Sequence, residues 1–221
     1  LELSSNFNLQ ITWNRPIKNL TNNTLSIKFS HSNVFFQEKT ISVNQFRIQY
    51  NEVINDIISN MNDIRVGTGF DVHKFKKGKK LKLFGITIPF DKSLDGHSDA
   101  DVGFHSIVDA ILGGLCLGDI GNHFPPTDNK WKNKKSIFFM SHVRKLLINK
   151  KYKINNLDVT LICEKPKVSQ YQKKFIKSVA EALDIDDRKI NIKGTTTEKL
   201  GFLGREEGIG CQVSVTLSKN D

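Results

Sequence analysis

Apolar and polar residues alternate with clear periods over the second part of the chain. Residues 211–217 place apolar side chains at every other position, which predicts a strand with one buried face. Apolar residues recur at helical spacing in residues 136–147 and 168–183, which predicts two amphipathic helices. The chain therefore contains both kinds of regular element.

Weaker patterns complete this set. Further strands are predicted over residues 64–73, 81–89, 157–163 and 189–193. The first two of these are expected to be joined by a lysine-rich turn at residues 76–80. A helix is predicted over residues 98–116, with Ser98 or Asp99 as its cap. Strands mixed with helices, without repeats, predict a single α/β (α+β) domain over residues 64–221.

Residues 1–63 form a separate N-terminal extension. Residues 1–51 are rich in Asn and Ser and contain only two acidic residues, Glu2 and Glu38. This acid-poor composition resembles an organelle transit sequence. The alternative is a disordered, Asn-rich extension that carries no targeting signal. We therefore expect an extension that is transit-like or disordered.

Charge and cysteine content narrow the function classes. The chain has 221 residues and a formal net charge of +10, all of it in the predicted domain. A basic domain favours anionic partners, which are nucleic acid, acidic membrane or phosphorylated small molecules. The scattered Cys116, Cys163 and Cys211 form no CxxC pair, which argues against a disulfide scaffold or a cysteine zinc site. We expect three buried or inert thiols.

Two groups of residues suggest a metal site. Asp71 and His73 are two positions apart in a predicted strand, so their side chains share one face, and both are ligand types of zinc. Asp101, His105 and Asp109 follow at four-residue intervals, on one face of a predicted helix. The alternative for Asp71 and His73 is a surface Asp beside a core His that binds no metal. The alternative for the helical group is an ordinary solvated polar face.

A third group suits phosphate binding. The segment 194–199 (GTTTEK) offers backbone N–H groups, three hydroxyls and Lys199 to phosphate oxygens. Its one carboxylate, Glu198, suits a hard divalent cation that bridges such oxygens. The alternative is a helix cap, because T-x-x-E is also a capping box.

Together and in this order, four motifs resemble the 2-C-methyl-D-erythritol 2,4-cyclodiphosphate synthase family. The motifs are GTGFDVH at residues 67–73, HSDADVGFHSIVDA at 97–110, LGDIGNHFPPTD at 117–128 and GTTTEKLGFLGREEG at 194–208. The resemblance covers residues 64–221 and leaves the extension outside. It implies a mixed β-sheet covered by helices on one face, and a homotrimer with active sites between neighbouring subunits.

The resemblance also implies a reaction. In this family the 2-phosphate of 4-diphosphocytidyl-2-C-methyl-D-erythritol 2-phosphate attacks the β-phosphorus of the cytidine diphosphate arm. CMP leaves and 2-C-methyl-D-erythritol 2,4-cyclodiphosphate forms, which is a step of the non-mevalonate route to isoprenoid precursors. The family implies a small-molecule substrate and no nucleic-acid or membrane partner.

Matching this sequence to the family motifs implies that Asp71, His73 and His105 bind one Zn²⁺ per subunit. It also implies that Glu198 binds Mg²⁺ or Mn²⁺ together with the substrate. The resemblance implies that His97 and Thr196 are the catalytic residues. The resemblance also implies a set of substrate-binding residues, which are Asp71, Val72, His73, His97, Ser98, Asp119, Ile120, Gly121, Phe124, Pro125, Pro126, Thr127, Asp128, Cys163, Glu164, Lys165, Pro166, Lys167, Val168, Ser169, Thr195, Thr196, Thr197, Glu198, Phe202 and Arg205. Four positions depart from the family pattern, which are Pro126, Cys163, Gly194 and Glu206.

Two other functions fit part of the sequence. A zinc-dependent phosphohydrolase would use the same Asp and His ligands with water as the nucleophile. A basic nucleic-acid-binding module would account for the charge and for the lysine clusters at residues 76–80 and 130–135. However, few stacking aromatic residues are interleaved with those clusters. The transit-like extension, together with the family, predicts a plastid or apicoplast location.

Overall fold

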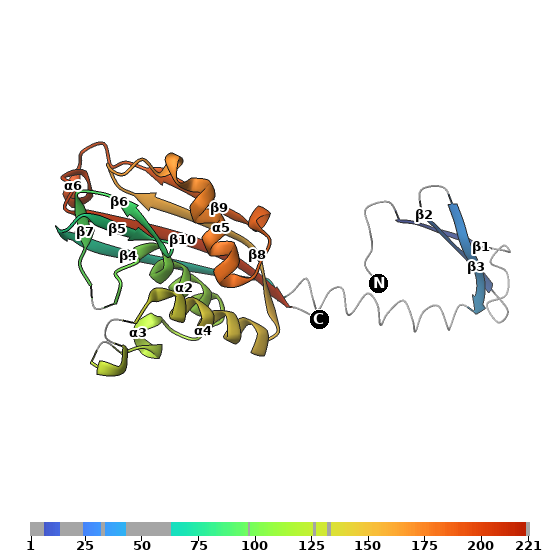
Figure 1. The fold of residues 1–221 in the computed structure, drawn as a ribbon. Coiled ribbons are helices and arrows are strands. Elements are labelled where there is room, and N and C mark those ends of the chain that lie inside the picture. The colour runs from blue at the N-terminus through green and yellow to red at the C-terminus, as the bar shows by residue number, and fades with distance from the viewer. Residues whose placement is uncertain are drawn as a thin grey trace. The chain divides into compact units, whose positions relative to one another are not determined.

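The computed structural model divides the chain into two compact units, Leu1–Asn62 and Asp63–Asp221 (Figure 1). Each unit is described by itself. The residues that the structure describes are 7–13, 24–31, 34–42, 63–96, 98–125, 127–131 and 134–219. None of the helices within these residues has both the length and the apolar character needed to cross a membrane.

The first unit contains three antiparallel strands in the order β1-β2-β3. They are β1 (Phe7–Trp13), β2 (Thr24–His31) and β3 (Val34–Ser42). The expectation of a transit-like or disordered extension did not include them. A signal was present in the sequence, because Leu25, Ile27 and Phe29 alternate with polar residues. The role of the extension as a transit sequence stays a prediction.

The second unit is built on a mixed five-stranded sheet in the order β7-β4-β10-β8-β9. All neighbouring pairs are antiparallel except β8 and β9, which are parallel. The strands are β4 (Arg65–Lys77), β7 (Lys92–Leu94), β8 (Tyr152–Ile162), β9 (Ile190–Thr195) and β10 (Gly208–Lys219). The mixed sheet that the family resemblance implies is confirmed.

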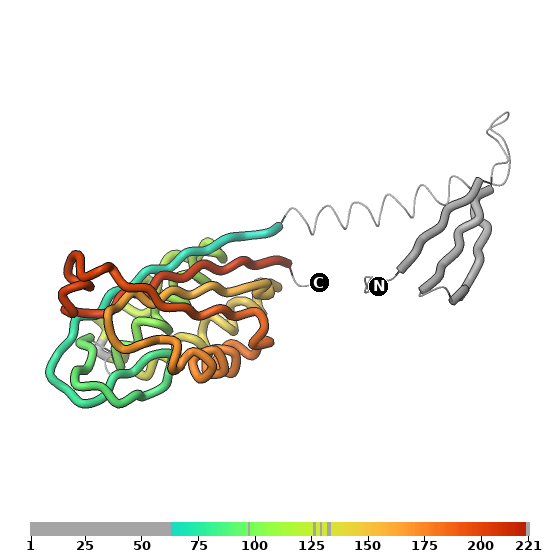
Figure 2. Tube along the Cα trace, turned by 90° about the horizontal axis from the view of Figure 1, so that it is seen from above, coloured from blue at the N-terminus to red at the C-terminus, as the bar shows by residue number. Residues whose placement is uncertain are grey.

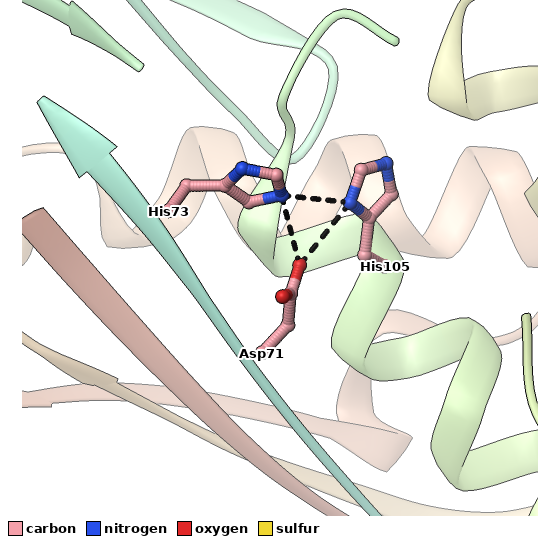
Figure 3. A group of neighbouring side chains, drawn as sticks. All are labelled: Asp71, His73 and His105. Carbon is pink, nitrogen blue, oxygen red and sulfur yellow. Dashed lines mark hydrogen bonds and ion pairs between the residues drawn. The ribbon is translucent and has the colours of Figure 1, made fainter. Parts of the chain in front are cut away.

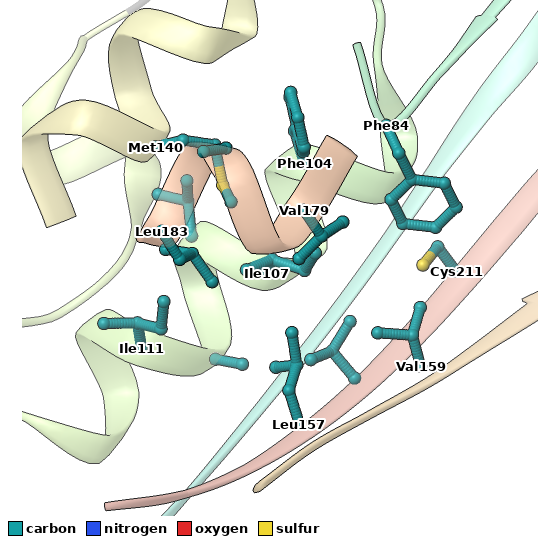
Figure 4. Close-up of a cluster of buried hydrophobic side chains, with 14 of the residues drawn as sticks. Phe84, Phe104, Ile107, Ile111, Met140, Leu157, Val159, Val179, Leu183 and Cys211 are labelled. Carbon is teal, nitrogen blue, oxygen red and sulfur yellow. The ribbon is translucent and has the colours of Figure 1, made fainter. Parts of the chain in front are cut away.

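Three helices cover one face of this sheet (Figures 1 and 2). They are α2 (Val102–Gly114), α4 (Ser136–Asn149) and α5 (Gln172–Leu183). The apolar core fills the space between these helices and the sheet (Figure 4). Short helical segments connect these elements, namely α3 (Ile120–His123), α6 (Gly201–Gly204) and the 3₁₀ turns Asn129–Trp131, Val168–Gln170 and Asp187–Lys189.

The alternating pattern of β10 is confirmed side chain by side chain. Cys211, Val213 and Val215 are fully buried under the helices, whereas the intervening Gln212 and Ser214 are exposed. The opposite face of the sheet is not wholly polar, because β4 exposes two large apolar side chains there. Val66 is 66% exposed and Phe70 is 57% exposed.

The predicted strand at residues 81–89 is wrong, because a tight turn divides it into a hairpin. The hairpin consists of β5 (Lys80–Leu83) and β6 (Ile86–Pro89). Phe84 and Gly85 form the turn with φ of +51° and +76°, the combination that twists a two-residue hairpin turn correctly. Phe84 is also a fully buried core residue, so its apolar character concealed the turn in the sequence.

Two glycines of β4 allow helix α2 to approach the sheet closely. A Cβ added at Gly67 would lie 1.9 Å from the backbone oxygen of Ala110, and one at Gly69 would lie 2.1 Å from that of Ser106. Neither position tolerates a side chain without movement of the helix backbone. Because His105 adjoins Ser106, this close approach places His105 against the middle of β4, beside Asp71.

We expect Gly69→Ala to destabilise the domain by about 1–3 kcal/mol, because the added methyl group forces α2 away from β4. The free energy of unfolding from urea titration measures this effect. Gly113→Ala is the matched control, since its nearest neighbour would be Thr68 O at 3.7 Å, an ordinary contact. Equal stability of the Gly69→Ala variant and the wild type would contradict the close-packing argument.

Candidate active site

Three side chains converge where β4 passes under helix α2 (Figure 3). Asp71 Oδ2 lies 3.0 Å from His73 Nε2 and 3.2 Å from His105 Nδ1. The two imidazole nitrogens are 3.1 Å apart. One carboxylate oxygen and two ring nitrogens therefore point at a common centre, and the shared face predicted for Asp71 and His73 is confirmed.

The surroundings of His73 determine which of its nitrogens is available. His73 Nδ1 lies 2.7 Å from the carbonyl oxygen of Asp95. A carbonyl oxygen only accepts hydrogen bonds, so Nδ1–H is the donor. In the neutral ring, Nε2 then carries the lone pair, and Nε2 is the atom that faces Asp71 and His105.

The electrostatics of the cluster favour a positive charge at its centre. Burial raises the pKa of Asp71, but hydrogen bonds from His105 and His73 outweigh it and hold that pKa well below its usual range. Burial lowers the pKa of His73, yet the adjacent Asp71 carboxylate raises it overall. One carboxylate and two imidazoles whose ligand atoms all lie within 4.8 Å of one another suit a catalytic zinc site with an open position.

The two neighbouring acids of α2 do not join this cluster, contrary to the single face predicted for Asp101, His105 and Asp109. Asp101 is fully buried as the N-cap of the helix, and its Oδ1 accepts N–H bonds from Phe104 at 3.1 Å and Phe84 at 2.8 Å. Helix α2 therefore begins at Val102, and the predicted caps were wrong. Asp109 accepts from the N–H of Ile120 at 2.7 Å instead.

Two serine hydroxyls contact the other ring nitrogen of His105, and only one of them was predicted as a site residue. His105 Nε2, on the side of the ring away from Asp71, lies 3.0 Å from Ser98 Oγ and 3.0 Å from Ser136 Oγ. Ser98 was predicted as a phosphate contact, but Ser136 was not predicted as a site residue. Ser136 is 31 positions away from His105 in the chain, so no local spacing could have revealed the contact.

The predicted substrate-binding residues of the loop after α2, residues 119–128, have different structural roles. Asp119 caps α3 by accepting the N–H of Asn122 at 2.8 Å. Phe124 is only 7% exposed and packs against Trp131 and Phe139. Thr127 is exposed, whereas Asp128 is half-buried. The predicted residues His97 and Pro126 lie outside the described part of the chain.

A cavity of about 600 Å³ brings two predicted segments together. The parallel pairing of β8 with β9 places Ile162 opposite Thr195, and Cys163 N donates to Thr195 O at 3.0 Å. The loops that follow both strands therefore border one space. The lining residues are Cys163, Glu164, Pro166, Lys167, Val168, Ser169, Gln172, Ile192, Lys193, Gly194, Thr195 and Thr196.

The Thr-rich segment is a strained loop rather than a helix cap. Glu198 and Lys199 have φ of +52° and +64°. Helix α6 begins only at Gly201, with Leu200 as its N-cap, so the capping-box interpretation is not supported. Left-handed backbone at non-glycine residues is costly and often marks functional sites. Exposed Glu198 accepts a hydrogen bond from Thr196 Oγ1 at 3.1 Å.

Glu164 holds this loop in place. Its Oε1 accepts N–H bonds from Thr197 and from Lys199, both at 3.2 Å. The carboxylate predicted to contact substrate thus binds backbone in the structure. The family departure at Glu206 also has a structural counterpart, because Glu206 has φ of +56°, the region that favours glycine. Arg205 Nε pairs with Glu207 Oε1 at 2.7 Å.

The metal cluster and the cavity are separate within one chain. Among the described residues, those that line the 600 Å³ cavity include none of Asp71, His73 and His105. The cavity lies at the ends of β8 and β9, whereas the cluster lies between β4 and α2.

Comparisons with known proteins give a consistent result. Residues 64–218 match the model described as the YgbB family. The chain is 49% identical over 156 residues to 2-C-methyl-D-erythritol 2,4-cyclodiphosphate synthase of Francisella philomiragia, covering 70% of this chain and 98% of that protein. It is 47% identical over 166 residues to the bifunctional enzyme IspD/IspF of Erythrobacter litoralis, covering 75% of this chain and 43% of that enzyme.

A solved structure agrees with these relatives. The CDP complex of IspF from Plasmodium falciparum superposes with a TM-score of 0.64 and is 38% identical, covering 72% of this chain and 97% of that one. The chain spans less than half the length of the bifunctional relatives that it matches.

Proposed function

The chain belongs to the YgbB family, and on this basis we propose that it is a 2-C-methyl-D-erythritol 2,4-cyclodiphosphate synthase, a cyclising phosphorus–oxygen lyase that releases CMP. Its substrate is then 4-diphosphocytidyl-2-C-methyl-D-erythritol 2-phosphate, in the non-mevalonate route to isoprenoid precursors. The observation that carries this proposal is the convergence of Asp71, His73 and His105 in a domain that also presents a Thr-rich phosphate loop. The CDP complex of the solved relative supports a cytidine nucleotide ligand.

The proposed reaction needs no nucleophilic side chain. A bond forms between an oxygen of the substrate's 2-phosphate and its β-phosphorus, and the bond from the β-phosphorus to the oxygen of CMP breaks. Asp71, His73 and His105 would hold Zn²⁺, which would supply positive charge to a phosphate oxygen. The protein's main contribution is to position the two phosphates, because their proximity and orientation carry much of the rate.

Hydroxyl groups bind the phosphates in this proposal. Ser98 Oγ accepts the N–H of Ala100 at 3.3 Å and lies 3.0 Å from His105 Nε2. Its hydroxyl proton is then free to be donated to the 2-phosphate. Exposed Thr196 borders the cavity from the strained loop and presents its hydroxyl to the diphosphate. We propose the same stabilising role for His97.

We propose a second cation, Mg²⁺ or Mn²⁺, at Glu198. Glu198 is an exposed carboxylate in a segment that otherwise suits anions. A carboxylate beside a diphosphate repels it unless a cation lies between them. Mg²⁺ commonly binds one or two carboxylates together with substrate phosphates and several waters.

We also propose a homotrimer with active sites between subunits. Two observations support it: the described residues that line the cavity include none of the metal cluster, and the uncovered sheet face exposes Val66 and Phe70. Exposed apolar side chains on a sheet favour burial against another surface. Sedimentation at several concentrations measures the oligomeric state.

Product analysis tests the proposed reaction. The full chain is incubated with zinc, magnesium and the cytidyl substrate, and the products are followed by ³¹P NMR. We expect cyclic diphosphate and CMP in equal amounts. Release of inorganic phosphate would instead favour a zinc phosphohydrolase. Salt-dependent binding of generic RNA without a metal requirement, and no turnover, would favour a nucleic-acid-binding module.

For the location, we propose a plastid or apicoplast. The support is the acid-poor composition of residues 1–51 and the proposed role in isoprenoid synthesis. Expression of the full-length precursor with a C-terminal fluorescent tag, in an apicoplast-bearing or plastid-bearing cell, tests this location. A uniformly cytosolic signal would contradict it.

We expect a shortened chain that begins at Asp63 to keep its turnover and its oligomeric state. The family match starts at residue 64, and a relative covered over 98% of its length lacks a counterpart of the extension. Asp63 is kept because it accepts a hydrogen bond from the hydroxyl of Tyr152 at 2.7 Å. Steady-state turnover and sedimentation measure the two properties. A large loss of either would show that the extension is structural.

A further inference from the structure

The nitrogen of His105 that faces away from the metal cluster lies in a polar network that neither the family comparison nor the proposed reaction explains. Ser136, the first residue of α4, is fully buried, and its Oγ lies 3.0 Å from His105 Nε2. Ser136 Oγ also donates to Asp99 Oδ1. Asp99 in turn accepts from Lys82 Nζ at 2.6 Å. The network therefore runs from Lys82 through Asp99 and Ser136 to His105.

The direction of each hydrogen bond follows from the charge of Asp99. Burial raises the pKa of Asp99, but hydrogen bonds from Lys82 and Ser136 outweigh it and lower that pKa. An ionised carboxylate only accepts, so the Ser136 hydroxyl uses its single proton on Asp99. The Ser136 oxygen can then serve His105 only as an acceptor. The Ser136 contact therefore assigns a proton to His105 Nε2. Ser98 Oγ, 3.0 Å from the same nitrogen, is then a second acceptor for that proton.

This proton assignment matters for the metal cluster. A neutral imidazole with its proton on Nε2 has its lone pair on Nδ1. Nδ1 is the atom that lies 3.2 Å from Asp71 Oδ2 and 3.1 Å from His73 Nε2. The opposite tautomer would direct an N–H at the position of the cation.

We propose that Asp99 and Ser136 are positioning residues, which hold His105 in the tautomer and orientation that bind zinc through Nδ1. The inference rests on the metal site of the proposed function and extends it to two residues that do not contact the metal. Residues that bind the second nitrogen of a metal-ligating histidine typically change metal affinity by about 10–100-fold. Lys82 completes the network by neutralising Asp99.

The zinc dissociation constant of the full chain tests the inference without substrate. Competition with a chromophoric chelator measures it for the wild type and for Ser136→Ala. We expect Ser136→Ala to bind zinc about 10–100-fold more weakly. Ser106→Ala is the matched control, because Ser106 is also fully buried on α2, yet its Oγ donates to Val102 O at 2.8 Å, outside the network. That variant should bind zinc as the wild type does.

A second measurement separates positioning from general destabilisation. In the zinc-loaded wild type, ¹⁵N NMR of the imidazoles should show His105 protonated at Nε2 and ligated at Nδ1, and Ser136→Ala should weaken that signature. If Ser136→Ala does not fold, Lys82→Met leaves Ser136 and His105 in place and should weaken zinc binding in the same direction.

The outcomes distinguish this inference from the proposed function. Wild-type zinc affinity in Ser136→Ala, or an equal loss in Ser106→Ala, would overturn the positioning role alone. A wild-type chain that binds no zinc would overturn the metal assignment itself, and the positioning role with it.

Discussion

Glu198→Gln is expected to lower turnover by about 10²–10³-fold while zinc binding and the oligomeric state stay unchanged. The expected size is that of removing one electrostatic contact to a reacting group. Glutamine has nearly the same shape and can still accept the hydrogen bond from Thr196 Oγ1 that the structure shows at 3.1 Å. The variant therefore removes the negative charge and little else. Without that charge the second cation is not recruited, and the repulsion between the two phosphates is no longer screened.

The dependence of the rate on Mg²⁺ measures this effect directly. In the wild type, the second cation should bind weakly without substrate and firmly with it, whereas zinc should stay bound throughout. In Glu198→Gln the rate should need far more Mg²⁺ to reach its maximum. Glu181→Gln is the matched control, because Glu181 is an exposed glutamate of α5 whose one ion pair among the described residues is with Lys177, at 3.9 Å. Near-normal turnover with unchanged Mg²⁺ dependence would show that Glu198 does not recruit a cation.

His105→Ala is expected to abolish stoichiometric zinc binding and turnover in a chain that remains folded. The substitution removes one of three ligand atoms from the cluster, and a cation held by Asp71 and His73 alone loses much of its affinity. His105 is 9% exposed and its ring packs near Phe139. The truncation therefore leaves a small void at the edge of the core, with a modest cost in stability.

Zinc content after dialysis against a weak chelator measures this prediction, and circular dichroism confirms the fold. His142→Ala is the matched control, because His142 also lies in a pair of histidines, 3.1 Å from His123 Nδ1, but outside the metal cluster. It should retain one zinc per chain. Full zinc occupancy in His105→Ala would contradict the assignment of His105 as a ligand.

The fold was predictable where local periodicity reports burial directly. The alternation in residues 211–217 predicted the buried face of β10, because each strand residue points to the opposite face from its neighbour. The helical spacing in residues 136–147 likewise matched α4. The prediction failed at residues 81–89, where two left-handed residues, one of them buried Phe84, make a turn that hydropathy cannot reveal.

The ligand pair in β4 was predictable for the same reason. Asp71 and His73 are two residues apart in one strand, so their common face depends only on the strand's own geometry. The family motifs added His105, Glu198 and the Thr-rich loop as expectations. The prediction that Asp101 lies on one helix face with His105 was wrong. Asp101 instead caps α2 and accepts the N–H of Phe84 in the hairpin turn.

Tertiary packing alone determined how these pieces meet. Gly67 and Gly69 let α2 lie directly on β4, and this contact brings His105 to Asp71 across 34 positions of the chain. The first turn of α4 brings Ser136 to His105 across 31 positions and to Asp99 across 37. Local sequence patterns describe the faces of single elements, whereas these contacts depend on which faces pack together. That choice is made by the burial of the whole core between the sheet and its three helices.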